Sequence, residues 1–339
     1  MPVLRTLLVF SVFIYGVASS ADLKLNVLKK WTLPPDYKIN KKKVGGLSGC
    51  SIFENKIYFV SDDRGSEGGP RIFIFKFDYA KQEIDFDKPA VINVQTDKQS
   101  KILDLEGIAV LSNSNIFLSS EGDLNQKPRV NPDLFWINEK GERIKTVQSS
   151  DKFLPEKSGK QTKGVQNNLA FEGLAVDEEQ KKWAVMLEAP LLQELTELKL
   201  VESSFESNKF DAVYSYPLPK LFTASQENDQ KITAYFGVSD ILFLNKTSYL
   251  ILERGLKLSK EGLGYHTQFC EASRTDSQQL TRKCFYSMNE DVQLKDLIPS
   301  GANFEGLCWV NKQKKQFITV SDNNFSKSEK TVFILYQLN

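Results

Sequence analysis

Short runs of apolar residues alternate along the chain with segments rich in glycine, proline, asparagine and aspartate. Such runs predict β-strands, because those four residue types favour tight turns. The predicted strands fall into five successive groups. They are 47–53, 57–61, 71–77 and 90–94; 106–111, 116–120, 134–138 and 143–147; 172–176, 183–187, 212–216 and 232–236; 240–244, 249–252, 268–270 and 284–288; and 305–310, 316–320 and 331–337.

Each group contains, at its start, a variant of one short motif. Three copies read Glu-Gly-apolar-small, and two copies carry Ser in place of Glu. The leading residues of the five copies are Ser48, Glu106, Glu172, Ser239 and Glu305, which lie 58, 66, 67 and 66 residues apart. A nearly constant period in this range is typical of architectures in which every repeat is one supersecondary unit.

The last group has three strands, and the run at 23–33 can supply the fourth. That arrangement closes a toroidal β-propeller, because one end of the chain completes the sheet begun by the other and no free edge remains. The path from Glu305 through both ends of the mature chain to Ser48 is 61 residues, close to the other steps. We therefore expect an all-β, five-bladed β-propeller. Six blades would need only about 53 residues each, and a two-sheet sandwich would not explain so regular a period.

The first 20 residues resemble a signal peptide. Arg5 precedes an apolar run at 7–17, which is too short to span a membrane, and three small residues follow at 18–20. An N-terminal anchor helix is the alternative. We expect residues 21–339 to form a single propeller domain that is secreted or periplasmic. Because 44 Lys and Arg balance 43 Asp and Glu, nucleic acid and anionic membranes are not favoured as partners, and we expect a monomer.

Four cysteines in an exported chain suggest disulfides. Cys270 and Cys284 flank a polar stretch within one repeat and are the first predicted pair. Cys50 and Cys308 occupy nearby positions of the first and last repeats, so they could pair if the chain closes on itself. Free buried thiols are the alternative for this second pair.

The leading residues of the five motifs are candidate metal ligands. In a propeller the first strand of each blade is innermost, so these five side chains would converge on the axis. Three carboxylates facing one axis repel one another unless a proton or a cation neutralises them. Oxygen donors alone favour a hard metal ion, and calcium tolerates irregular oxygen cages better than magnesium does. The predicted Ca²⁺ ligands are Ser48, Glu106, Glu172, Ser239 and Glu305.

A second acidic set follows the second strand of each blade and should reach the same mouth of the channel. It consists of Asp62-Asp63, Glu121, Glu188, Glu253 and Asp322. Four of these are candidate general bases: Asp63, Glu121, Glu188 and Glu253. Candidate ligand-binding residues for a small anionic substrate are Arg64, Arg254, Asn168 and Asn323. The alternative interpretation is that the acidic residues only form turns and that the arginines pair with neighbouring acids.

Several motifs, in this order, resemble those of the exported phytase-like proteins labelled "esterase-like activity of phytase". They are GLSG at 46–49, SDDR at 61–64, DLEG at 104–107, SE at 120–121, NLAFEGLA at 168–175, LER at 252–254, NFEG at 303–306 and SDNNF at 321–325. The resemblance implies a β-propeller in a bacterial periplasm or outside the cell. The order Ser, Glu, Glu, Ser, Glu is also similar to the calcium ring of the calcium-dependent apyrases.

Two functions remain in view. The first is a calcium-dependent hydrolase of a phosphoester or related ester, which the resemblance to calcium-dependent phytases implies, although this chain lacks a clear lysine cluster among its motifs. The second is a non-catalytic propeller in which calcium stabilises the axis and the mouth binds a glycan, a peptide or a protein. Ser-His-Asp catalysis has little support, because His266 is the sole histidine.

Overall fold

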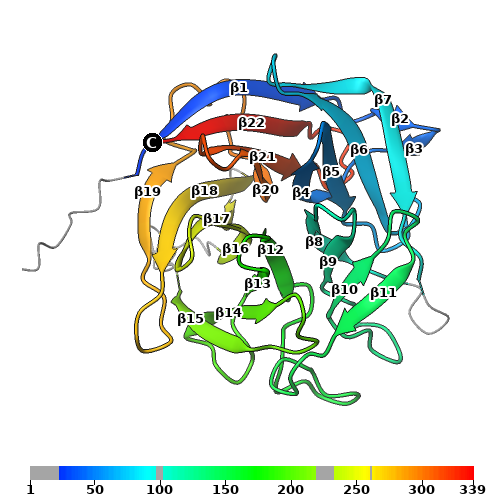
Figure 1. Cartoon of the computed structure of the whole chain (residues 1–339), viewed down its shortest axis with the longest axis vertical. Helices are drawn as coiled ribbons and strands as arrows, with labels where there is room; N and C mark the ends of the chain where they lie inside the picture. The colour runs from blue at the N-terminus through cyan, green and yellow to red at the C-terminus, as the bar shows by residue number, and fades with distance from the viewer. Residues whose placement is uncertain (1–22, 97–101, 219–232, 260–261) are drawn as a thin grey trace, which may run out of the picture.

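The computed structural model describes residues 23–96, 102–218, 233–259 and 262–339. The predicted signal peptide at 1–20 lies outside these residues. In the described ranges, no helix is long and apolar enough to cross a membrane. The strands form five four-stranded antiparallel sheets around a common axis, with a small additional hairpin of β2 (Lys38–Ile39) and β3 (Lys42–Lys43) (Figure 1).

The predicted five-bladed propeller is confirmed. Blade 1 contains β4 (Leu47–Phe53), β5 (Lys56–Ser61), β6 (Arg71–Asp78) and β7 (Glu83–Asn93). Blade 2 contains β8 (Leu105–Val110), β9 (Ile116–Ser120), β10 (Asp133–Ile137) and β11 (Arg143–Val147). Blade 3 contains β12 (Phe171–Asp177), β13 (Lys182–Leu187), β14 (Glu197–Ser204) and β15 (Ala212–Pro217). Blade 4 contains β16 (Thr233–Phe243), β17 (Ser248–Ser259), β18 (Gly262–Ser273) and β19 (Lys283–Ser287).

Blade 5 is built from both ends of the described chain. It contains β20 (Asn303–Asn311), β21 (Gln316–Asp322), β22 (Thr331–Leu338) and, outermost, β1 (Leu25–Leu33). Strands β1 and β22 pair antiparallel from Leu25 opposite Leu338 to Leu33 opposite Thr331. The predicted closure of the ring by the N-terminal strand is therefore confirmed (Figure 1).

Both predicted disulfides are present. The Cys50–Cys308 bond joins β4 of blade 1 to β20 of blade 5, with 5.4 Å between the Cα atoms. It therefore crosses the junction where the ring closes, and the alternative of free thiols is wrong for this pair. The Cys270–Cys284 bond joins residues that face each other on β18 and β19.

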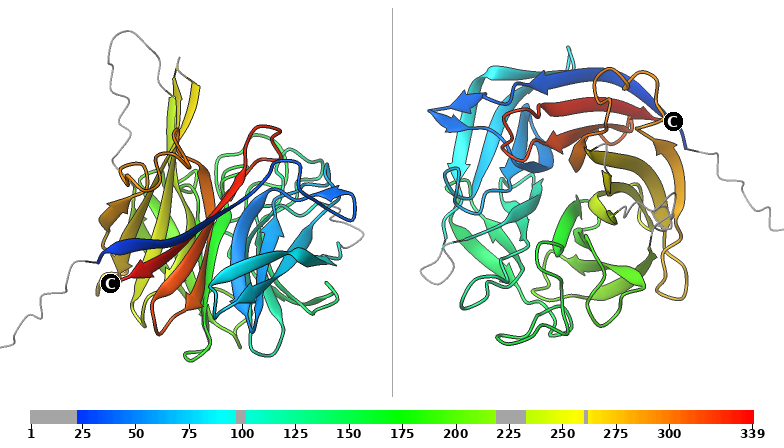
Figure 2. Two further views of the ribbon diagram at one scale, coloured as in Figure 1. Left: turned by 90° about the horizontal axis from the view of Figure 1, so that it is seen from above. Right: turned by 180° about the vertical axis from the view of Figure 1, so that it is seen from behind.

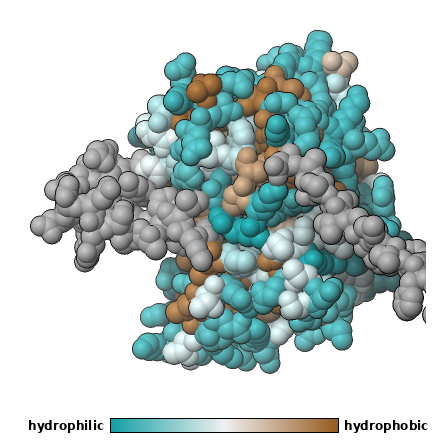
Figure 3. All heavy atoms as spheres, turned by 90° about the vertical axis from the view of Figure 1, so that its left-hand side faces the viewer, coloured by the Kyte–Doolittle hydropathy of each residue, from teal (hydrophilic) through white to brown (hydrophobic). Residues whose placement is uncertain are grey.

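The apolar core is divided into five clusters, each lying between two adjacent blades. Between blades 5 and 1, for example, the rings of Phe59 on β5 and Phe333 on β22 meet edge to face with centroids 5.4 Å apart. Burial of alternate strand residues in these clusters removes apolar surface from water. On the face shown in Figure 3, hydrophilic side chains predominate and apolar side chains form separate patches.

Blades 3 and 4 differ from the sequence prediction. The sequence predicts the last strand of blade 3 at 232–236, but residues from Thr233 onward belong to β16, the first strand of blade 4. Strand β14 (Glu197–Ser204) was missed, and the strand predicted at 212–216 is the fourth strand of blade 3 rather than the third. Strands β16, β17 and β18 are also longer than predicted and rise beyond the ring (Figure 2).

Every innermost strand carries a β-bulge at the leading residue of its motif. The register with the second strand shifts between Leu47 and Gly49, Leu105 and Ile108, Phe171 and Leu174, Val238 and Asp240, and Phe304 and Gly306. A bulge bends the strand and re-aims the side chain of the extra residue. The repeated motif is therefore a repeated local geometry as well as a repeated set of side chains.

The glycine after the leading residue allows neighbouring blades to approach closely. A Cβ atom at Gly49 would lie 2.3 Å from the carbonyl oxygen of Glu106 in the next blade, and one at Gly173 would lie 2.6 Å from the Cα of Asp240. Both distances are far below van der Waals contact. In blade 4, Asp240 occupies the position that glycine holds in the other four blades.

Candidate functional site

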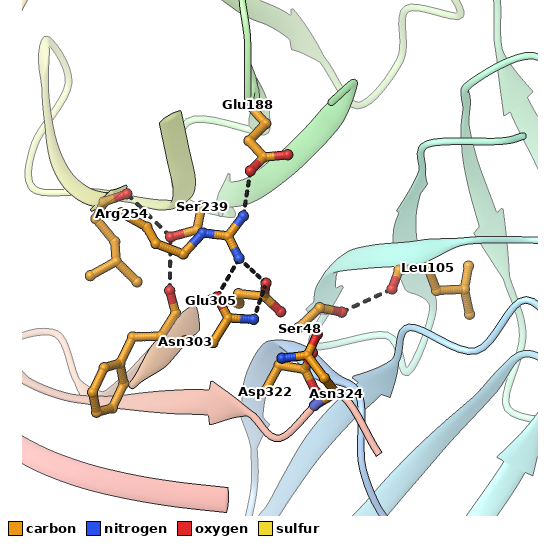
Figure 4. Close-up of polar contacts among 11 residues, drawn as sticks. Ser48, Leu105, Glu188, Ser239, Arg254, Asn303, Glu305, Asp322 and Asn324 are labelled. Atoms are coloured by element: carbon orange, nitrogen blue, oxygen red, sulfur yellow. Dashed lines mark hydrogen bonds and ion pairs between the residues drawn. The ribbon is translucent and has the colours of Figure 1, made fainter. Parts of the chain in front are cut away.

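An acidic cavity of about 240 Å³ opens at one mouth of the channel. It lies where the first strands of the blades begin and the second strands end. Its lining consists of Asp62, Glu106, Glu121, Asn168, Leu169, Glu172, Glu188, Arg254, Leu256, Tyr265, Asn303, Glu305 and Asn324. Six carboxylates and one guanidinium therefore face a common space, and Figure 4 shows the side of it that holds Glu188, Arg254 and Glu305.

Strand pairing defines the second ring of this mouth. In every blade, a residue at the end of the second strand, or just after it, pairs with a residue of the first strand or just before it. That partner lies two positions before the leading residue of the motif. We call the five residues from the ends of the second strands the second ring, and the five leading residues the first ring. The facing pairs are Gly46 and Asp62, Asp104 and Glu121, Ala170 and Glu188, Gly237 and Arg254, and Asn303 and Asp322. The second ring thus contains four carboxylates and, in blade 4, the arginine Arg254.

Glu253 is one residue out of this register and lies outside the cavity. Its side chain is fully buried and accepts hydrogen bonds from the Tyr216 hydroxyl at 2.6 Å and from Arg282 at 2.6 and 2.7 Å. The nearby sulfur atoms of Cys270 and Cys284 are joined to each other. The residue predicted as a general base thus lies in the interior of the fold, because a one-residue shift in a strand moves a side chain to the opposite face.

Asp63 also lies outside the cavity lining. Its carboxylate accepts hydrogen bonds from the backbone N–H groups of Gly65, Glu67 and Gly69 at 2.9–3.0 Å and forms a buried ion pair with Arg71. Burial acts to raise the pKa of Asp63, but the N–H of Glu67 and the Arg71 guanidinium outweigh it, so the pKa is lowered. Asp63 therefore organises the loop after β5, and its neighbour Asp62 lines the cavity in its place.

Of the four residues predicted to bind a ligand, Asn168 and Arg254 line the cavity. Arg64 is engaged with the buried Asp104, its Nε lying 2.7 Å from a carboxylate oxygen. Asn323 is buried, and its Oδ1 accepts a hydrogen bond from the N–H of Phe325 at 3.1 Å. The adjacent Asn324 lines the cavity instead.

Asn168 and Asn324 share an unusual backbone conformation. Their φ angles are 59° and 48°, in the left-handed region that asparagine tolerates better than most residues. The sequence places two adjacent asparagines, Asn323 and Asn324, after the second strand of blade 5, but it does not decide which of them faces the cavity.

The two serines of the predicted metal ring connect blades instead of facing the cavity. The Ser48 hydroxyl donates to the carbonyl oxygen of Leu105 in blade 2 at 2.9 Å, and the Ser239 hydroxyl donates to that of Phe304 in blade 5 at 3.0 Å (Figure 4). Both serines are buried and neither lines the cavity. The three glutamates of the same ring all line it.

Two groups of carboxylates among the described residues are close enough to share a cation. Oxygen atoms of Glu106, Glu121 and Glu172 lie within 4.8 Å of one another, and so do oxygens of Asp62, Asp104 and Glu106. Burial, followed by repulsion from neighbouring carboxylates, raises the pKa values of Glu106, Glu121 and Glu172 well above the ordinary range. The predicted general base Glu121 thus lies with two of the predicted metal ligands.

The opposite side of the cavity is neutralised internally. The Arg254 guanidinium forms ion pairs with Glu188 and Glu305 and donates to the Asn303 side-chain oxygen at 2.6 Å (Figure 4). Burial raises the pKa of Glu305 to about 8 despite this guanidinium. Asp322, at the end of β21, has its pKa raised to about 6, again mainly by burial. The cavity therefore has a charge-paired half and a half with excess carboxylates.

Several solved structures are similar in fold. A gluconolactonase of Xanthomonas campestris has 8% identity and a TM-score of 0.38 over 84% of this chain and 69% of its own. The Bacteroides ovatus protein described as xyloglucan PUL GH43B has 9% identity and a TM-score of 0.47 over 90% and 54%. The catalytic domain of a Coprinopsis cinerea GH62 α-L-arabinofuranosidase has 7% identity and a TM-score of 0.45 over 91% and 97%. Similarity at this level does not transfer an activity.

No curated protein matches the chain. A family model does: the one described as "Phytase-like: Esterase-like activity of phytase" matches residues 42–325. This range contains all four innermost strands of blades 1 to 4, β20 and β21, and every residue that lines the acidic cavity. The resemblance predicted from the motifs is confirmed, and the chain belongs to the phytase-like family.

Proposed function

We propose that the protein is an exported calcium-dependent hydrolase of a phosphoester or a related ester, acting at the acidic mouth of the propeller. The observation that carries this proposal is the charge of the cavity, in which six carboxylates face a single guanidinium. An anionic ester could not approach such a surface without a cation between them. The two disulfides support the exported location, because disulfides persist in oxidising compartments.

The residues present fit a calcium ion. The donor atoms of Glu106, Glu121 and Glu172 are all oxygens, lie within 4.8 Å of one another and are buried. Hard cations prefer such donors, and calcium accepts irregular carboxylate cages. Glu121 replaces the serines in the ligand set expected from the sequence, and Glu305 is withdrawn from it by Arg254.

In this proposal, Glu106, Glu121 and Glu172 hold the calcium ion. When bound, the ion supplies positive charge that attracts the ester and polarises it. Glu188 lines the cavity outside that group, is held in place by its ion pair with Arg254 and acts as the general base. The side-chain amides of Asn168 and Asn324 orient the substrate by donating hydrogen bonds to its oxygens.

The substitution Glu172→Gln tests the calcium site and the activity together. Removing one of three anionic ligands is expected to weaken calcium binding at least about tenfold and to reduce ester hydrolysis correspondingly. Calcium titration by calorimetry and a panel of phosphate and carboxylate esters, each assayed with calcium and with EDTA, measure both effects. Glu179→Gln, an exposed carboxylate at the other mouth, is the control and should match the wild type. Hydrolysis that EDTA leaves unchanged would contradict the proposal.

A second candidate function is a non-catalytic propeller that binds a glycan, a peptide or a protein. One observation favours it: Glu106 and Glu121 belong to blade 2 and Glu172 to blade 3, so an ion held among them would fasten two blades together. In that case Glu172→Gln should lower the melting temperature in calcium, and no ester of the panel should be hydrolysed by either protein.

Chelator-treated protein should lose stability as the pH rises from 5 to 8.5. The folded pKa values of Glu305 and Asp322, about 8 and about 6, lie above their ordinary values of 4.5 and 3.8. The folded state therefore holds protons that the unfolded chain releases, and the stabilisation that those protons provide is lost as the pH rises through the folded values. We expect the melting temperature to fall by about 5 °C or more.

Thermal unfolding at a series of pH values, with EDTA and with excess calcium, measures this effect. Excess calcium should raise the melting temperature at pH 7 and above, because the ion neutralises the carboxylates of Glu106, Glu121 and Glu172 in the other half of the cavity. A melting temperature that rises with pH in EDTA would contradict the conclusion that burial raises the pKa values of Glu305 and Asp322 in the folded state.

A further inference from the structure

We propose that Arg254 is a built-in cation that takes the place of a bound metal ion in one half of the acidic cavity and so limits how many calcium ions the site accepts. The inference rests on the proposed calcium site. It adds that Arg254 determines how many calcium ions bind to each chain. Three observations support it: the position of Arg254 in the second ring, the ion pairs and hydrogen bond that its guanidinium forms, and the burial of the side chains involved.

Strand β17 directs Arg254 into the cavity. The preceding residue, Glu253, is fixed in the fold interior by Tyr216 and Arg282. Because successive side chains of a strand point to opposite faces, Arg254 points away from the site of Glu253, and it lines the cavity. There it pairs with Gly237 of β16, the position that faces a carboxylate in each of the other four blades.

The guanidinium bridges two other blades. It forms ion pairs with Glu188 of blade 3 and Glu305 of blade 5, and it donates a hydrogen bond to Asn303 of blade 5 (Figure 4). Its side chain is 13% exposed, and those of Glu188 and Glu305 are 4% and 9% exposed. Asn303 donates a further hydrogen bond to Glu305 at 2.8 Å. A fixed positive charge thus occupies the position between two carboxylates where a bound cation would otherwise lie.

Blade 4 is also the blade in which both ring positions lack a carboxylate. Ser239 stands in the first ring and Arg254 in the second, whereas blades 2, 3 and 5 carry an acid in both. The positive charge is therefore placed beside the gap in the acidic ring, between the acids of blades 3 and 5. On the other side of the cavity, Glu106, Glu121 and Glu172 have no arginine among the hydrogen-bond partners that the structure shows for them.

Loss of the guanidinium charge would leave Glu188 and Glu305 buried without their shared counter-ion. Uncompensated buried carboxylates must bind a proton or a cation. At pH 7.5 and with calcium present, a second calcium ion can replace the guanidinium, because two carboxylates and the Asn303 side-chain oxygen supply hard oxygen donors.

Calcium titration of chelator-treated full-length protein at pH 7.5 tests the inference. Arg254→Gln is expected to bind one more calcium ion per chain than the wild type, whereas Arg254→Lys, which keeps a positive charge, is expected to keep the wild-type number. Lys312→Gln is the matched control, because Lys312 pairs with the buried Asp177 at the opposite mouth, with 3.2 Å between the charged atoms. It should also keep the wild-type number.

The same number of bound ions in folded Arg254→Gln and in the wild type would overturn the inference. If the variant folds only in calcium, the metal content of the protein purified in calcium is counted instead, and a number equal to the wild type again overturns it. Failure of the wild type to bind calcium would contradict the proposed function separately. A merely structural role for Arg254 would lower stability but would not add a bound ion.

Discussion

Replacing Cys50 and Cys308 together by alanine is expected to lower the free energy of unfolding by about 5 kcal/mol. The two residues are 258 positions apart in the sequence. In the chain-entropy model, a cross-link that closes so long a loop removes about 5 kcal/mol of conformational freedom from the unfolded state. Chemical denaturation of the oxidised wild type and of the double variant measures the difference.

The other disulfide provides the matched comparison. Cys270 and Cys284 are 14 positions apart, so the same model gives about 3 kcal/mol for the corresponding double alanine variant. These two residues also face each other within one sheet, where β18 and β19 already hold them together. A larger loss for the 270/284 variant than for the 50/308 variant would contradict the role assigned to the bond across the ring junction.

Asp240→Ala should cost about 3–5 kcal/mol of folding stability. The buried carboxylate accepts hydrogen bonds from the backbone N–H of Leu174 in blade 3 at 3.2 Å, of Ile241 in blade 4 at 2.8 Å and of Leu307 in blade 5 at 2.5 Å. One side chain therefore connects three innermost strands. Its removal leaves N–H groups of two neighbouring blades without an acceptor inside the protein.

Two further variants identify the cause of that loss. Asp240→Asn keeps one acceptor oxygen and should lose about half as much stability as the alanine variant. Asp276→Ala removes an exposed aspartate of the same blade and should change stability by no more than about 0.5 kcal/mol. Equal stabilities of the Asp240→Ala variant and the wild type in urea denaturation would show that these hydrogen bonds contribute nothing.

The repeat made most of the fold predictable. Its period gave the number of blades, and the missing last strand gave the closure through 23–33, because a propeller without that strand would leave a sheet edge open. Blades 3 and 4 were harder. Strand β14 is followed by the fourth strand β15, which ends at Pro217, and β16 begins seven residues earlier than its predicted bound of 240. Spacing alone did not reveal those limits.

The candidate site was predictable by residue type but not by register. The glutamates at 106, 172 and 305 line the cavity as their repeat position suggests. In contrast, Glu253 and Asp63 lie one residue away from the positions that face the channel. Carboxylates at adjacent positions look alike in a sequence, and only the pairing of the strands decides which one points toward the axis. The bulges change the direction of the leading side chains, and the residue types alone do not identify them.

The composition of blade 5 from β1 and β22 has a consequence for how the protein reaches its native state. Its outermost strand, β1, precedes the other described strands in the sequence, and it must wait for its partner β22 until nearly all of the described chain has been made. Until then β1 presents unpaired backbone groups, and the Cys50 thiol lacks its partner Cys308. Ring closure is thus the contact with the greatest sequence separation, so assembly of this blade should be slow. Oxidative folding should end, not begin, with the bond between Cys50 and Cys308.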